Sequence, residues 1–242
     1  MISIFRREIA QYFLTPAGYV FTGIFWLLGA VFFFLYNVLA ASSDLSAMFG
    51  NMSFIFMMIV PLLTMRLLSE ERRGRTMQLL YSAPVSLTSV VLGKFLAACA
   101  VLLVALAGTS LYVAVIARYA RVYAGLIFSN YLGFFLLCAC SIAVGVLMSA
   151  LTESQITAAV LTFGANMLLQ LLEMIAPSLH VPYLPFLPDL LRCISLYTHY
   201  DAFTSGLVRP ASIAYYMGFV TIVLSLAVYI LSKRRWSGKG AA

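Results

Sequence analysis

Charged residues are scarce in this chain of 242 residues: they make up 10% of it, whereas hydrophobic residues make up 63%. Soluble domains carry about 25% charged and about 45–50% apolar residues. So few charges cannot cover the surface of a water-soluble fold, which excludes a soluble globular enzyme, a disordered protein and a fibrous repeat. The composition therefore predicts an all-α integral membrane protein, with one domain over residues 1–242.

The sequence motifs of catalysis and metal binding are also missing. The phosphate-binding pattern G-x-x-x-x-G-K-[ST] does not occur, because Gly93-Lys94 is followed by Phe95 and lacks the preceding glycine. Neither H-E-x-x-H nor G-x-S-x-G is present. His180 and His199 have no metal-ligand spacing, and the four cysteines form no disulfide framework. We therefore expect no enzyme activity, no metal and no cofactor in this chain.

Six apolar runs are long enough to cross a membrane, since a crossing takes about 20 residues. They lie at about residues 17–41, 48–68, 95–117, 131–151, 156–176 and 212–231. Residues 1–15 precede them and have one apolar side, formed by Ile2, Phe5, Ile9, Tyr12 and Phe13. The other side carries Arg6, Arg7, Glu8 and Gln11. This pattern predicts an amphipathic helix that lies in the membrane interface.

The positive charges indicate how the spans are oriented. Eleven of the fifteen Lys and Arg residues fall on the side of the N-terminus, the loop after the second run and the C-terminal tail. The other four are Arg118, Arg121, Arg192 and Arg209. Because Lys and Arg are retained in the cytoplasm, both termini are predicted to be cytoplasmic, which is consistent with an even number of spans. The net charge of +7 is thereby explained by topology, and no nucleic-acid partner is expected.

A long cytoplasmic loop follows the second span. Its charged residues surround Gly74, and residues 76–81 favour a short helix, which Pro84 ends because the residue before a proline avoids the helical region. A short, partly apolar helix outside the bilayer suits insertion into a groove of a partner protein. The alternative is a solvated loop that only fixes the topology.

The same loop resembles a known family signature. The relevant residues are Glu70-Glu71-Arg72-Arg73-Gly74-Arg75-Thr76-Met77-Gln78-Leu79-Leu80, then Ala83-Pro84-Val85-Ser86 and Leu92-Gly93-Lys94. They are similar to the signature of ABC-2 type transporter permeases, and most similar to the gliding-motility-type branch. Two departures are that Gly74 lies one residue early, before Arg75, and that Gln78 replaces an acidic residue.

The resemblance implies a coupling helix, between spans 2 and 3, that docks on an ATP-binding subunit. On residues 70–86, the implied contacts are Thr76, Met77, Gln78, Leu79, Leu80, Tyr81, Ser82 and Ala83, followed by Pro84, with a polar collar of Glu70, Glu71, Arg72, Arg73 and Arg75. It also implies a dimer of ABC ATPase subunits that binds ATP and Mg, a second identical or related permease, and an extracytoplasmic accessory subunit in some relatives. The implied location is the bacterial plasma (inner) membrane, and the implied process is export.

Polar residues recur on one face of the fifth run. They are Thr162, Asn166, Gln170 and Glu173, spaced four, four and three residues apart. Two interpretations stay open: a lining of the transport path or permease interface, and ordinary hydrogen bonding between helices. The outer segment, residues 177–211, contains five prolines and is expected to form short or re-entrant helices.

Two other classes of function compete with an exporting permease. A non-transporting membrane scaffold or regulatory subunit of an envelope complex would keep the six spans and the docking helix, but it needs no polar path. An ion channel or secondary transporter would more often carry ionisable pairs near the middle of the membrane. The polar stripe argues slightly against the scaffold.

Overall fold

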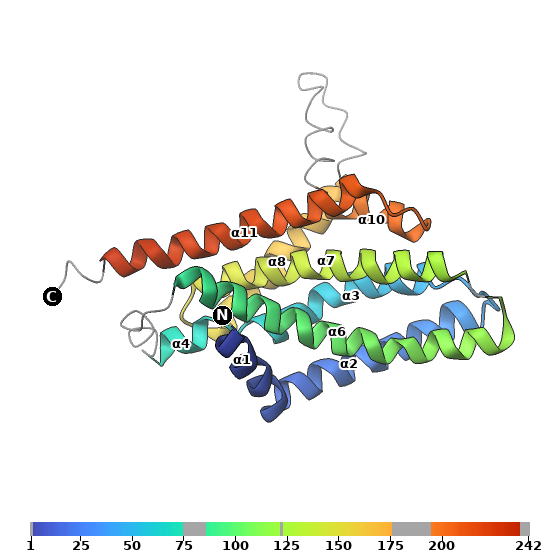
Figure 1. Ribbon diagram of the computed structural model, residues 1–242, viewed down its shortest axis with the longest axis horizontal. Coiled ribbons are helices and arrows are strands. Elements are labelled where there is room, and N and C mark those ends of the chain that lie inside the picture. The colour runs from blue at the N-terminus through green and yellow to red at the C-terminus, as the bar shows by residue number, and fades with distance from the viewer. Residues whose placement is uncertain (1, 75–85, 122, 176–194, 238–242) are drawn as a thin grey trace, which may run out of the picture.

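The computed structural model describes residues 2–74, 86–121, 123–175 and 195–237, without the side chains of residues 172–175 and 234–237. The described residues form helices and no strands. The long helices are α2 (Pro16–Phe33), continued by the π-helix η1 (Phe34–Val38), α3 (Ser46–Thr64), α6 (Leu87–Tyr119), α7 (Ala124–Leu151), α8 (Gln155–Ile175) and α11 (Pro210–Ser237). The short helices are α1 (Ile2–Leu14), α4 (Ser69–Arg73) and α10 (Leu196–Thr204). Most of the long helices run along the long axis of the molecule (Figure 1).

Five described helical segments are long and apolar enough to cross a membrane. They are Pro16–Val38, Ser46–Arg73, Leu87–Tyr119, Ala124–Leu151 and Pro210–Lys233. The described apolar part of α8, Gln155–Leu171, is shorter. The protein is therefore a helical, multi-pass membrane protein.

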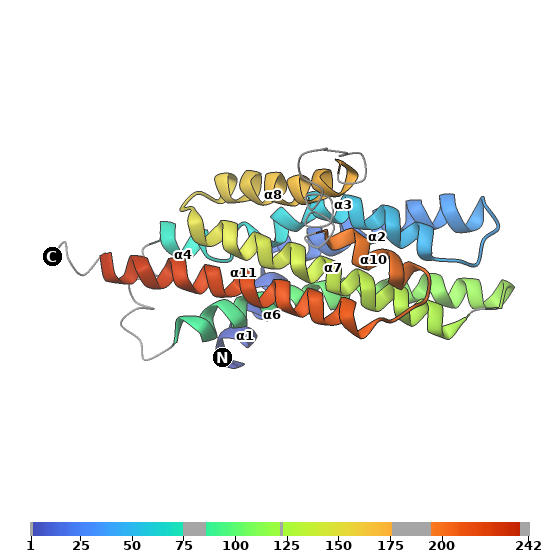
Figure 2. The same cartoon turned by 90° about the horizontal axis from the view of Figure 1, so that it is seen from above.

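Helix α7 forms the centre of the bundle, between α8 and α6 when the molecule is viewed from above (Figure 2). Of the most apolar 18-residue stretch of α7, 78% is buried inside the protein, compared with 22% for the corresponding stretches of Pro16–Val38 and of α11. Phe134 of α7 packs against the rings of Phe49 and Phe56, with ring centroids 5.2 and 5.8 Å apart. In contrast, Leu27 of α2 and Tyr229 of α11 are more than 60% exposed. The core is thus apolar, and the outer helices present apolar side chains to their surroundings, as a bilayer requires.

Helices α3 and α7 approach closely because Gly145 has no side chain. A Cβ at this position would lie 2.3 Å from Oγ1 of Thr64 and 2.7 Å from its Cβ. Small residues at such crossings let helices pack backbone to backbone, which is a common way to associate in a membrane. This contact brings the end of α3 next to the end of α7, where the site described below is built.

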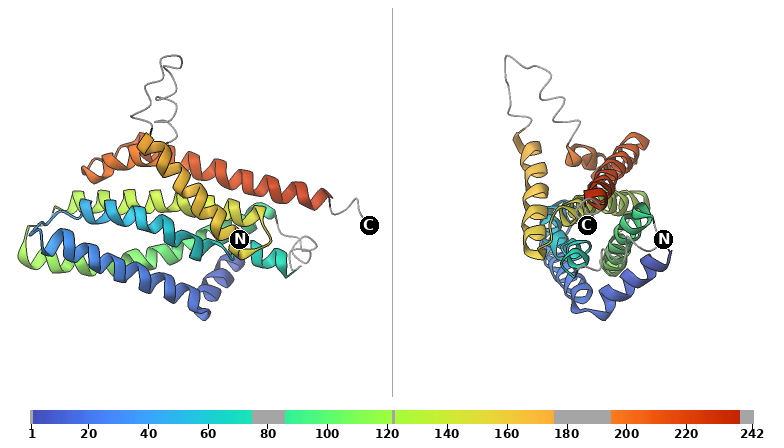
Figure 3. Two further views of the ribbon diagram at one scale, coloured as in Figure 1. Left: turned by 180° about the vertical axis from the view of Figure 1, so that it is seen from behind. Right: turned by 90° about the vertical axis from the view of Figure 1, so that its left-hand side faces the viewer.

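The two ends of the bundle carry different elements. Helix α4 and the last turns of α11 lie at one end, while α10 and the start of α11 lie toward the other (Figures 1 and 3). Ser129 of α7 donates a hydrogen bond of 2.8 Å to the carbonyl of Phe203, which attaches α10 to α7. Helix α10 is the described short helix of the segment 177–211.

Candidate functional site

The structure describes both flanks of the coupling segment predicted from the sequence, but not its middle. Residues 75–85 lie outside the described residues, and with them Arg75, Thr76, Met77, Gln78, Leu79, Leu80, Tyr81, Ser82, Ala83 and Pro84. The preceding flank is α4, which carries Glu70, Glu71, Arg72 and Arg73. The following flank is the start of α6, where Ser86 caps the helix by accepting a hydrogen bond from the Ser89 amide.

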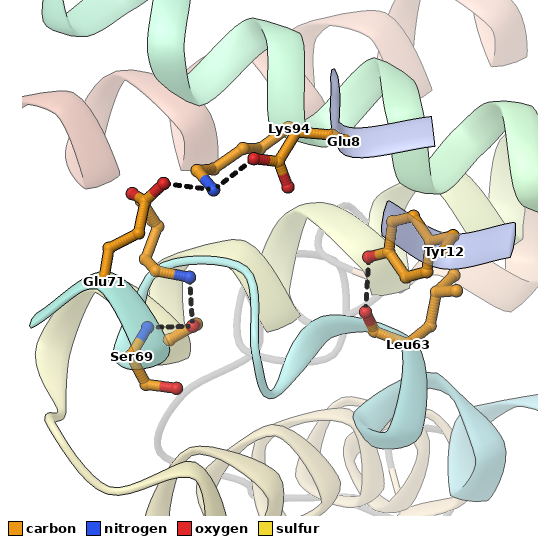
Figure 4. Close-up of polar contacts among 8 residues, drawn as sticks. Glu8, Tyr12, Leu63, Ser69, Glu71 and Lys94 are labelled. Atoms are coloured by element: carbon orange, nitrogen blue, oxygen red, sulfur yellow. Dashed lines mark hydrogen bonds and ion pairs between the residues drawn. The ribbon is translucent and has the colours of Figure 1, made fainter. Parts of the chain in front are cut away.

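The two flanks meet at a buried cluster of three charges, Glu8, Glu71 and Lys94, which we call the ion cluster. Nζ of Lys94 lies 2.8 Å from Oε1 of Glu8 and 2.9 Å from Oε1 of Glu71 (Figure 4). The exposed fractions of the side chains are 3% for Lys94, 8% for Glu8 and 19% for Glu71. A charge so deeply buried needs a partner of opposite sign. The cluster therefore ties α1, α4 and α6 together.

The placement of Glu8 and Lys94 corrects the sequence analysis. Glu8 was expected on the polar side of residues 1–15, and Lys94 in a cytoplasmic loop. In the structure, α6 begins at Leu87, so its second and third turns carry Lys94 into the bundle, where α1 packs against α6. Glu8 and Tyr12, four residues apart, are the buried residues of α1. The side of α1 that faces the protein thus includes a carboxylate, because Lys94 requires one.

Tyr12 joins α1 to the end of α3. Its hydroxyl donates a hydrogen bond of 2.6 Å to the carbonyl of Leu63 (Figure 4). Burial, reinforced by the charge of Glu8, raises the pKa of the Tyr12 phenol. The hydroxyl therefore stays protonated and keeps its role as the donor.

Helix α4 is anchored to the end of α7. Oγ of Ser149 accepts hydrogen bonds from the amides of Leu68 and Ser69, at 3.0 and 3.1 Å. These are amides at the start of α4, which have no partner within their own helix. Ser149 therefore acts as a cap supplied by another helix.

Arg72 adds two further bonds at the same place. Its guanidinium donates to the carbonyl of Ala150 at 2.9 Å and forms an ion pair of 2.8 Å with Glu153. Glu153 lies between α7 and α8, and its side chain is 71% exposed. Of the predicted collar, Glu71 and Arg72 thus bind within the chain, whereas Glu70 and Arg73 are exposed.

The polar residues predicted on one face of α8 do not take part in the junction, by which we mean the contacts described above among α1, α3, α4, α6 and α7. Thr162 and Asn166 are fully buried, Gln170 is partly exposed, and the side chain of Glu173 lies outside the described residues. Helix α8 packs on α3 and α7 of the same chain. The hydroxyl of Thr162 donates to the carbonyl of Ala158 at 2.7 Å, and the Asn166 amide has no hydrogen-bond partner among the described residues. In this conformation the first two stripe residues are enclosed by the protein.

Sequence reasoning missed Glu8, Tyr12, Lys94 and Ser149 as members of the junction. One signal for Lys94 was available. It lies between Leu92-Gly93 and Phe95-Leu96, and an ammonium within an apolar stretch needs a buried carboxylate. Which carboxylate it meets depends on the packing of α1 and α4, which the local pattern does not contain.

The comparisons with known proteins agree with this architecture. The family model described as ABC-2 family transporter protein matches residues 37–235. The chain therefore belongs to the ABC-2 family of transporter permeases, the membrane components of ABC transporters. A comparison with curated proteins gives no match. The gliding-motility-type branch stays a prediction from the loop residues.

Proposed function

We propose that this chain is the permease subunit of an ABC exporter, in which a separate ATPase dimer binds ATP and Mg and drives substrate across the membrane. A second permease, identical or related, would complete the path, and an accessory extracytoplasmic subunit would join as in some gliding-type relatives. The location proposed is the bacterial inner membrane, with both termini in the cytoplasm. Membership of the ABC-2 family supports the class of protein.

We propose six crossings, of which α8 is the fifth. Helix α8 starts near the end of the bundle where α4 lies, whereas α11 starts toward the opposite end and runs back (Figures 1 and 3). A crossing between the start of α8 and the start of α11 would account for these two positions. This direction supports an even number of crossings, and the asymmetry of Lys and Arg supports cytoplasmic termini.

The observation that carries the coupling proposal is the attachment of both flanks of residues 75–85. On one side, α4 is bonded to α7 through Ser149 and Arg72. On the other side, Lys94 of α6 is paired with Glu71 of α4 and Glu8 of α1. A partner that moves residues 75–85 would therefore act on α1, α6 and α7 together. Nucleotide drives transport only if the bound ATPase stabilises one membrane conformation over another, and these attachments give its movement a route.

A scaffold without transport is the second candidate. The enclosure of Thr162 and Asn166 against α3 and α7 favours it, because these residues line no open path in this conformation. A scaffold would still bind its partner through residues 75–85. The two functions are separated by whether nucleotide on the partner changes the exposure of the membrane helices.

The first experiment is co-purification of the chain from its native host in mild detergent, followed by mass spectrometry. The test variant is Leu79→Ser/Leu80→Ser/Tyr81→Ser. The matched control is Leu207→Ser/Val208→Ser, because both of these side chains are exposed on the segment between α10 and α11. The expected result is an ABC ATPase with the native chain and the control but not with the test variant, at equal yield of folded protein. Absence of an ATPase from the intact native complex would refute the proposal.

A second experiment tests the topology. Single cysteines at Ser154 and Ser205, both exposed, are placed in a chain whose four native cysteines are replaced by alanine. A membrane-impermeant maleimide on intact spheroplasts is expected to label Ser205→Cys only, and Ser154→Cys only after lysis. Equal labelling of both positions before lysis would place them on the same side of the membrane and refute a single crossing between them.

A further inference from the structure

A cavity of about 370 Å³ lies beside the ion cluster, between α1, the end of α3 and α4. Its size falls in the range of small-ligand sites, which is about 300–1,000 Å³. Its walls carry three basic and three acidic side chains, namely Arg7, Arg66, Lys94, Glu8, Glu70 and Glu71. A cavity lined by six charged side chains favours a polar ligand. It lies where α1 meets the membrane-spanning helices.

The two arginines of the cavity are available for that ligand. Lys94 is engaged by Glu8 and Glu71, as described above. Arg7 and Arg66 are exposed, and neither forms an ion pair or a side-chain hydrogen bond with the described residues. They come from different elements, α1 and the turn after α3, and line the same cavity. Guanidinium groups bind phosphate oxygens in a two-pronged geometry, and two of them in one cavity suit a phosphate.

The remaining lining indicates where the phosphate comes from. Four apolar or aromatic residues, Tyr12, Leu62, Leu63 and Leu67, also line the cavity and form what we call its apolar wall; Leu62 is 40% exposed, and the other three are at most 8% exposed. Leu14, at the end of α1, is 84% exposed, which an apolar surrounding such as lipid would tolerate. A ligand with a phosphate and an apolar continuation matches this combination better than a free anion does.

We propose that this cavity binds the phosphodiester of a membrane phospholipid, with Arg7 and Arg66 holding the phosphate and the apolar wall receiving the glycerol and the start of the acyl chains. The bound lipid braces α1 against α3 and α4, next to the ion cluster. The proposal does not depend on the ATPase partner, because all of its residues belong to this chain.

The test is native mass spectrometry of the purified, delipidated chain titrated with phosphatidylglycerol or phosphatidylethanolamine. The variants are Arg7→Gln, Arg66→Gln and the double variant, and the control is Arg6→Gln, which is exposed on α1 but does not line the cavity. We expect one tightly bound phospholipid on the native chain and on the control, and an affinity about tenfold lower for each arginine lost. Arg66→Lys keeps the positive charge but loses the two-pronged guanidinium, so its affinity for the phospholipid should lie between those of the native chain and of Arg66→Gln.

Three outcomes would overturn the proposal. The first is a native chain that retains no phospholipid, and the second is an equal loss in Arg6→Gln and Arg66→Gln, which would show general attraction to the membrane surface. The third is displacement of the lipid by excess glycerol phosphate as complete as by the phospholipid itself, which would assign the cavity to a free phosphate. Thermal unfolding of each variant separates loss of binding from loss of the fold.

Discussion

Replacement of Lys94 by methionine is expected to destabilise the protein strongly, because it leaves two carboxylates without their ammonium. At 2.8 and 2.9 Å, each contact corresponds to about 6 kcal/mol of Coulomb energy with an effective dielectric constant of about 20. Desolvation of all three groups and repulsion between Glu8 and Glu71 offset most of this. Removing one partner of a buried pair costs about 3–5 kcal/mol in practice. Glu71 is 19% exposed and can be hydrated. We therefore expect Lys94→Met to lower the free energy of unfolding by about 3 kcal/mol, near the lower end of this range.

The assay is thermal unfolding in detergent, followed by intrinsic fluorescence. A chain of this size loses about 2–4 °C of melting temperature per kcal/mol, so Lys94→Met should melt roughly 6–12 °C lower than the native chain. The matched control is Arg73→Met, which removes an exposed positive charge from α4 and should change the melting temperature by no more than about 2 °C.

A second variant shows whether the loss comes from stranded carboxylates. In Glu8→Gln/Glu71→Gln/Lys94→Met no charge remains in the cluster, so most of the lost stability should return, to within about 1–2 kcal/mol of the native chain. If Lys94→Met melts within about 2 °C of the native chain, or if the triple variant is less stable than Lys94→Met, the reasoning is refuted. The ammonium would then be no stabilising partner for these carboxylates.

Three further predictions concern the packing around the junction, and all are measured by the same unfolding assay. Gly145→Ala should lower the free energy of unfolding by about 1–3 kcal/mol, because the added Cβ would clash with the side chain of Thr64 on α3. Gly164→Ala should raise it by about 0.5–1 kcal/mol, because a Cβ there meets nothing within 4 Å. Equal effects of the two variants would contradict the close contact between α3 and α7. Ser149→Ala should cost about 1–3 kcal/mol, because it strands two buried amides, and a neutral result would mean that these amides find other partners. Arg72→Met should cost about 1–2 kcal/mol through its bond to a carbonyl, while Glu153→Gln should cost less than about 0.5 kcal/mol because this carboxylate is 71% exposed; the reverse order would refute this division.

The helical membrane architecture could be predicted from the sequence because each span is a local property. A window of about 20 apolar residues is sufficient, whatever it packs against. Helix bounds were less accessible. The third apolar run begins near residue 95, yet α6 starts at Leu87. The polar residues Ser86, Thr88 and Ser89 hide the first turns from a hydropathy argument, although Ser86 is a good N-cap.

Sequence reasoning reaches a candidate site only where one stretch of chain carries its signal. Residues 70–86 carry such a signal, in their charges, their helix-forming residues and Pro84, and the coupling segment stays a prediction. The ion cluster, in contrast, joins residues 8, 71 and 94, and no spacing rule relates them. The amphipathic pattern of α1 predicts that Glu8 is exposed, because it assigns every charged residue to the polar side, and this prediction is wrong. Tertiary packing decides which charge is buried, and one buried lysine is enough to reverse the local preference.

The pair between Glu71 and Lys94 has a geometric consequence for the segment between them. These residues are 23 positions apart, yet their charged atoms lie 2.9 Å apart. The pair therefore closes the chain from α4 to α6 into a loop with a fixed base. Without the pair, the two flanks, α4 and the start of α6, would lack this link to each other. With the pair, separating the two flanks would also separate two charges of opposite sign in a largely buried site, which is unfavourable. If residues 75–85 bind an ATPase as proposed above, a displacement of their two flanks would be transmitted to α1, α4 and α6 together, because the ion cluster links these helices.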